Sequence, residues 1–240
     1  MAGPIRAVLF DLDDTLLENN MNRFLKGYFG LLAPHMARFV APERFMLSLL
    51  ASTQAMIDNT DPTITNQQVF IADFFPRVGR TLDEMMPAFD EFYATQFVKL
   101  RDLTRLTPEA HTAVQTAFDA GCDVVIATNP LFPESAIRHR MEWANIANFS
   151  YQLVTSYEVM HFCKPRPQYY TEIVERLGHE PEECIMVGDD WENDIAAALQ
   201  AGLRVYSVNT TAPTPPGLDS VPRGSLADFR NQLSNSGSQK

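Results

Sequence analysis

The sequence predicts an α/β protein: a parallel sheet flanked by helices, with an all-helical segment inserted after the first strand. Short apolar runs without polar alternation recur along the chain, as is typical of parallel strands buried on both faces. Stretches with helical spacing separate most of the later runs, which indicates strand–helix–strand units. Residues 20–105 break this alternation. A length of 240 residues suits one large domain or a core with an inserted domain.

The apolar runs predict five strands. They lie at residues 5–10, 123–127, 153–155, 184–187 and 205–208. The intervening patterns predict four helices, whose ends carry capping residues, proline or glycine. They run from Thr107-Pro108 to Gly121, over 133–144, over 167–177 before Gly178, and over 193–201 before Gly202. Near the end of the chain we expect a loop at 210–217, a short helix at 225–233 and a frayed tail at 235–240.

Residues 20–105 are rich in Phe, Met, Leu and Ala. Apolar residues recur there at helical spacing, as in Phe24, Tyr28 and Leu32, and a loop is expected at 58–65, which contains Pro62. The methionine and aromatic stripes are more typical of core packing than of a ligand site. This segment is therefore expected to be an inserted helical domain.

The charge balance argues against two kinds of partner. Acidic residues number 30 and basic residues 19, for a net charge of −11, and no basic stripe offsets this charge. Nucleic acid and anionic membranes would be repelled. We find no secretory signal and no apolar stretch long enough to span a membrane. The three cysteines lack metal-site or disulfide spacing, so we expect a cytoplasmic protein with reduced, mostly buried thiols.

The first chemical motif follows the first strand directly. Ligands of open parallel sheets bind beyond the carboxyl ends of the strands. Asp11 and Asp13 are one residue apart on extended chain, so their carboxylates can point the same way. They would provide a nucleophile beside an acid/base group. A solvated acidic turn is the alternative interpretation.

Two further motifs offer groups for a phosphate. Thr128 and Asn129 end the second strand, where a hydroxyl and free backbone N–H groups suit a phosphoryl oxygen; alone, the pair is more typical of a turn. Lys164 lies between a strand and a helix and could supply a compact positive charge, although a single lysine is usually a surface residue. Arg166 is a second candidate for this role.

A fourth motif spans residues 188–194 and holds four carboxylates in six residues. Such carboxylates repel one another unless a cation or a lysine neutralises them, and hard oxygen ligands suit Mg²⁺. A helix N-terminus also favours acids, which could explain Glu192. It explains Asp189 poorly, because that residue directly follows Gly188 at the strand end.

These four motifs, in this order, resemble the haloacid dehalogenase superfamily, a group of phosphohydrolases and relatives. The resemblance covers nearly the whole chain and implies a Rossmann-like, three-layer core with a helical cap between the first and second motifs. The core would comprise residues 1–19 and 106–240, and the cap residues 20–105. Many members have glycine where this chain has Asp14, a small departure.

The resemblance also implies a role for each motif residue. Asp11 matches the nucleophile and Asp13 the general acid/base. The other roles are phosphate binding by Thr128, Asn129 and Lys164, magnesium binding by Asp11, the backbone carbonyl of Asp13 and Asp189, and support by Asp190 and Asp194.

The expected function is Mg²⁺-dependent hydrolysis of a small phosphorylated metabolite through an aspartyl-phosphate. A 2-haloacid dehalogenase is one alternative, but those relatives need no metal and lack the acid that Asp13 provides. A phosphomutase and a catalytically idle binding protein are the others.

Overall fold

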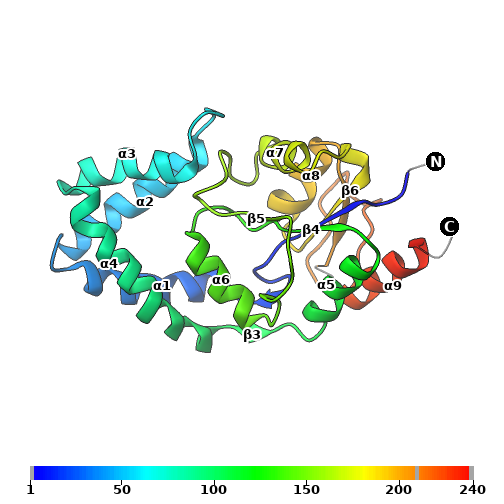
Figure 1. Cartoon of the computed structure of the whole chain (residues 1–240), viewed down its shortest axis with the longest axis horizontal. Coiled ribbons are helices and arrows are strands. Elements are labelled where there is room, and N and C mark those ends of the chain that lie inside the picture. The colour runs from blue at the N-terminus through cyan, green and yellow to red at the C-terminus, as the bar shows by residue number, and fades with distance from the viewer. Residues whose placement is uncertain (1–2, 209–210, 238–240) are drawn as a thin grey trace.

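The computed structural model describes residues 3–208 and 211–237 (Figure 1). Five strands form one sheet in the order β5-β4-β1-β6-β7, and every neighbouring pair is parallel. They are β1 (Ala7–Phe10), β4 (Asp123–Ile126), β5 (Leu153–Val154), β6 (Cys184–Gly188) and β7 (Arg204–Ser207). The five predicted strands are thus confirmed, with ends that differ by one or two residues.

Helices cover both faces of the sheet, because alternate residues of a strand point to opposite sides. Val8 and Phe10 of β1 pack with three helices, and Ala7 and Leu9 pack with the helices opposite. The first group is α5 (Ala110–Asp119), α6 (Glu134–Trp143) and α9 (Leu226–Gly237); the second is α7 (Pro167–Leu177) and α8 (Ala197–Gln200). The predicted three-layer, Rossmann-like α/β core is confirmed.

Some helix ends differ from the predictions. Helix α5 begins at Ala110, and Thr107-Pro108 lies in the turn before it. The fourth predicted helix begins two residues early, as the π-helix η3 (Trp191–Ala196). Helix α9 continues into the expected tail as far as Gly237, and residues 238–240 lie outside the described part. Residues 211–217 form no helix or strand, as expected; residues 209–210 are not described.

The inserted segment consists of helices, which occupy the left of Figure 1. They are α1 (Met21–Met36), α2 (Pro42–Asp58), α3 (Asn66–Val78), α4 (Leu82–Thr95) and the 3₁₀ helix η1 (Phe97–Leu103). Capping boxes fix the starts of α3 and α4, formed by Thr65 with Gln68 and by Thr81 with Glu84. The predicted loop before α3 is present.

A short ribbon at the junction was not predicted. Strands β2 (Leu17–Glu18) and β3 (Arg105–Leu106) pair antiparallel, so the two connections to the helical segment run side by side. The expected boundaries at 19/20 and 105/106 fall at this ribbon.

The three cysteines are buried, as expected. Among the described residues, no helix is both long and apolar enough to cross a membrane.

Candidate active site

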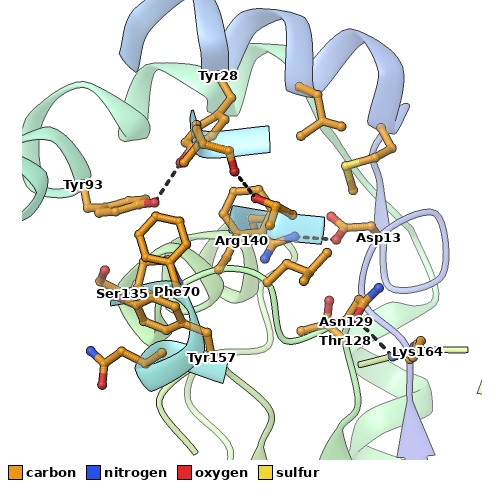
Figure 2. A pocket seen from close by; sticks show the side chains of 18 of the residues that line it. Asp13, Tyr28, Phe70, Tyr93, Thr128, Asn129, Ser135, Arg140, Tyr157 and Lys164 are labelled. Atoms are coloured by element: carbon orange, nitrogen blue, oxygen red, sulfur yellow. Dashed lines mark hydrogen bonds and ion pairs between the residues drawn. The ribbon is translucent and has the colours of Figure 1, made fainter. Parts of the chain in front are cut away.

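The carboxyl ends of β1, β4 and β6 meet at one edge of the sheet, beside the helical segment. A cavity of about 600 Å³ lies there. All eight residues predicted from the motifs line it: Asp11, Asp13, Thr128, Asn129, Lys164, Asp189, Asp190 and Asp194. The structure therefore brings together residues from four separate motifs, several of which appear in Figure 2.

Lys164 lies between two buried carboxylates. Its Nζ is 2.7 Å from Asp11 Oδ1 and 2.6 Å from Asp194 Oδ1. Burial alone would lower the pKa of Lys164, but the charges of Asp11 and Asp194 hold it well above its usual value. The ammonium is thus charged. Its hydrogen bond to Asp11 Oδ1 orients that carboxylate, whose other oxygen, Oδ2, is not bonded to Lys164.

A third carboxylate leaves this cluster with excess negative charge. Oxygens of Asp11, Asp189 and Asp194 lie within 4.8 Å of one another. Burial, helped by the charge of Asp194, raises the pKa of Asp189 to about 7, while a hydrogen bond of 3.1 Å from Thr15 Oγ1 opposes the rise. Three carboxylates with one lysine fit a hard divalent cation such as Mg²⁺. Asp194, expected to have a supporting role, here contributes an oxygen to the cluster.

Asp13 also lines the cavity, and two donors hold its carboxylate. Asn19 Nδ2 donates to Asp13 Oδ1 at 2.7 Å, and Arg140 Nη1 donates to Oδ2. Figure 2 shows the guanidinium of Arg140 pointing at Asp13. Asp14, the position at which the family resemblance leads us to expect glycine, has φ 57°, a left-handed conformation that glycine adopts freely and aspartate tolerates.

Arg140 was missed from the sequence, although a signal was present. It is almost fully buried on α6, and it shares the helix face of Ala136, Ile137 and Met141. A charged residue within an apolar stripe needs a partner in the fold, because an unpaired buried charge is costly. Its guanidinium also lies over the ring of Phe132, 4.9 Å from the centroid.

The structure places the other two candidate phosphate-binding residues differently. Asn129 Oδ1 accepts from the backbone N of Lys164 at 3.2 Å, which leaves the Nδ2 group of Asn129 for a ligand. Arg166, the competing cation, donates to the carbonyls of Ile57 and Asp58 and does not line the cavity. Lys164 is thus the better placed of the two.

Asp190 and Gly188 shape the turn that carries Asp194. Asp190 Oδ1 accepts from the backbone N of Glu192 and of Asn193, both at 2.8 Å, and so caps helix η3. A Cβ atom on Gly188 would lie 2.2 Å from Asp194 Oδ2. Only glycine therefore lets Asp194 approach the strand end and Lys164.

The chain matches the haloacid dehalogenase-like hydrolase family over residues 5–202. It therefore belongs to this family, as the motifs indicated. Hexitol phosphatase A of Escherichia coli (strain K12) is 25% identical over 210 residues, which cover 88% of this chain and 86% of that protein. A phospholysine phosphohistidine inorganic pyrophosphate phosphatase of Xenopus laevis is 43% identical over 47 residues; the match covers 20% of this chain and spans 17% of that relative's length.

Solved structures of two activities share this fold. A HAD phosphatase from Thermococcus onnurineus has a TM-score of 0.60 at 18% identity, over 95% of this chain and 98% of that one. A 2-haloacid dehalogenase from Pseudomonas syringae pv. Tomato DC3000 has a TM-score of 0.63 at 21% identity, over 96% and 99%. At such identities the likeness shows the fold alone, and the activity must be argued from the site.

Proposed function

We propose that this hydrolase is a magnesium-dependent phosphatase, which cleaves a small phosphate monoester through an aspartyl-phosphate on Asp11. The observation that carries the proposal is one cavity that holds Asp11 beside Lys164, two further carboxylates of the acidic cluster, and Asp13. The family match and the phosphatase relatives support the same class of reaction.

The residues suggest two chemical steps. Asp11 Oδ2 attacks phosphorus, the bond from phosphorus to the ester oxygen breaks, and Asp13 gives that oxygen a proton. Asp13 then takes a proton from water, whose oxygen attacks phosphorus and releases Asp11 and inorganic phosphate. Lys164, Thr128 and the Asn129 amide would bind the phosphoryl oxygens during both steps.

The acidic cluster is the proposed metal site. Asp11, Asp189 and the backbone carbonyl of Asp13 would hold Mg²⁺, with Asp194 beside them. When bound, Mg²⁺ would offset negative charge on the phosphoryl oxygens.

The alternatives account for fewer of these residues. A 2-haloacid dehalogenase would need neither Asp13 nor the acidic cluster. A phosphomutase must exclude water after the first step, and we favour hydrolysis because the chain belongs to a hydrolase family. An idle binding protein would not need Asp11 and Asp13 to line one cavity.

We also propose that residues 20–105 act as a cap domain that moves relative to the core. The ribbon of β2 and β3 carries both connections, and a substrate must enter the cavity between the core and the helical segment. Movement at this ribbon would admit the substrate and later water.

A metal-removal experiment tests the activity. We expect purified protein to hydrolyse a generic aryl phosphate with Mg²⁺ and to lose this activity with a chelator, because the carboxylates then repel one another and the phosphate. Added Mg²⁺ should restore the rate. Full turnover of the metal-free protein, or release of halide from 2-chloropropionate, would contradict the proposal.

A further inference from the structure

We propose that the ester group bound in this cavity is bulky, apolar and free of a second negative charge. This inference rests on the proposed phosphatase function and names its class of substrate: monoesters of apolar alcohols or phenols. It depends on the part of the cavity that extends from the carboxylates into the helical segment.

The walls of this part are mainly aromatic and aliphatic. Helices α1, α3 and α4 contribute large apolar side chains, and Phe132 closes the core side. They include Leu25, Phe29, Phe70, Met86, Phe89 and Phe132. In Figure 2, Phe70 and the three labelled tyrosines (Tyr28, Tyr93 and Tyr157) lie across the cavity from Asp13 and Lys164. A phosphate bound at Asp11 would therefore direct its ester group toward apolar walls.

The volume also indicates a bulky ester group. About 600 Å³ falls within the range of sites that enclose a drug-sized ligand. A phosphoryl group with a two-carbon ester would leave most of this space to water, against walls that are mainly apolar. An apolar group that displaces this water gains free energy in proportion to the apolar area buried.

The charges disfavour a second anionic group. Among the described residues that line the cavity, the two cations are Lys164 and Arg140. Lys164 pairs with Asp11 and Asp194, and Arg140 pairs with Asp13. Nη2 of Arg140 has no partner but is fully buried, so it offers no contact to the contents of the cavity.

The other ionisable side chains on these walls are acidic or neutral. Asp90 and Glu158 both line the cavity and would repel a carboxylate or a second phosphate. The hydroxyls of Tyr28 and Tyr93 are 2.9 Å apart, and burial raises the pKa of both tyrosines well above the usual value. Both hydroxyls remain neutral. The hydroxyl that accepts in this pair can donate a hydrogen bond to an uncharged ligand group.

Binding of non-hydrolysable phosphonates tests this class without relying on turnover. We would titrate ethyl-, butyl- and hexylphosphonate into the protein with Mg²⁺ by calorimetry. Affinity should rise about fourfold per methylene, on the order of 10²-fold from ethyl to hexyl. A ligand of equal length whose terminal methyl is replaced by a carboxylate should bind at least about tenfold more weakly. Its charge would be buried without a cationic partner, which costs free energy. The same order is expected for kcat/KM of the matching alkyl phosphates.

Two phenylalanines, each stacked on another phenylalanine, provide a test variant and its control. Phe70 lines the cavity and stacks on Phe74, with ring centroids 4.9 Å apart. Phe149 is also half-buried and stacks on Phe118 at 5.3 Å, but it does not line the cavity. Phe70→Ala should reduce the hexyl-to-ethyl affinity ratio severalfold, whereas Phe149→Ala should leave this ratio unchanged.

The outcomes separate the two proposals. Flat affinity along the alkyl series, or tighter binding of the carboxylated ligand, would overturn the apolar class even if aryl phosphates were hydrolysed. A rising series without hydrolysis of any ester would sustain the ligand class and overturn the phosphatase function.

Discussion

The pairing of Asp13 with Arg140 and Asn19 is the least expected contact among single residues. An acid/base group must reach the ester oxygen in one orientation, and two donors hold this carboxylate in place. Arg140 itself touches no reacting atom in the proposed mechanism. It is therefore a positioning residue, which acts through Asp13.

Replacing Arg140 should slow turnover. Arg140→Met keeps much of the apolar contact with Phe132 but removes the donor to Asp13, so the carboxylate can turn away. We expect kcat for an alkyl phosphate to fall on the order of 10²-fold, as displacements near 1 Å can cause. Arg140→Lys, which retains a donor, should recover part of the loss. Steady-state kinetics beside thermal unfolding would check this, and wild-type kcat in a folded Arg140→Met protein would contradict it.

Some site residues could be predicted from the sequence and others could not, for a physical reason. Asp11, Thr128 and Asp189 could be placed together because each follows a buried strand, and parallel strands end at one edge. Arg140 could not be paired with Asp13, because 127 residues separate them and a lone arginine does not specify its partner. The motif residues line the cavity as predicted, whereas their chemical roles remain predictions.

Secondary-structure elements were predictable where burial imposed a pattern. The five sheet strands are nearly continuous apolar runs, so their positions were correct within a few residues. Strands β2 and β3 have two residues each, too few to show a period. The π-helix η3 starts within the acidic motif, where the sequence has no helical spacing of apolar residues that would predict it.

The turn from β6 into η3 gives a prediction at this scale. Gly188→Ala should displace Asp194, since the new Cβ would lie 2.2 Å from its Oδ2. The contact of 2.6 Å from Lys164 Nζ to Asp194 Oδ1 would then be lost. We expect kcat to fall on the order of 10²-fold, and the Mg²⁺ concentration needed for half-maximal activity to rise.

A matched glycine provides the control. At Gly30 of α1, an added Cβ would meet nothing within 4 Å, so Gly30→Ala should retain wild-type kinetics. Equal activity of both alanine variants would show that Asp194 does not need its place beside the strand end.

The whole molecule joins its two parts by contacts of different kinds. On one side, Phe97 of η1 stacks on Trp143 of α6 with ring centroids 5.7 Å apart. On the other, the start of α3 meets a core loop through hydrogen bonds: Asn66 N donates to Met160 O at 2.8 Å, and Gln67 N to Tyr157 O at 2.7 Å. The insertion and its helical class were predicted, but these contacts were not, because they join residues far apart in sequence.

Cap movement should appear in hydrogen exchange. If the cap opens by parting α3 from the core loop, the amides of Asn66 and Gln67 lose their acceptors and exchange. Inorganic phosphate with Mg²⁺ should slow both amides, while amides within β1 stay unchanged. Mass spectrometry after local proteolysis would measure this. Equal, slow exchange of both amides in the two states would indicate a cap that does not open there.

In the proposed mechanism, Asp11 carries the phosphoryl group. Asp13→Asn leaves Asp11 able to attack an aryl phosphate, whose leaving group needs little protonation, but it removes the base that activates water. Turnover of an alkyl phosphate should fall on the order of 10²–10⁴-fold.

The most direct measurement is the intact mass of Asp13→Asn protein after incubation with an aryl phosphate and Mg²⁺. We predict that a species heavier by one phosphoryl group accumulates, and that Asp11→Asn/Asp13→Asn protein gives none. Wild-type turnover by Asp13→Asn without any adduct, or an adduct that persists in the double variant, would contradict the proposed mechanism.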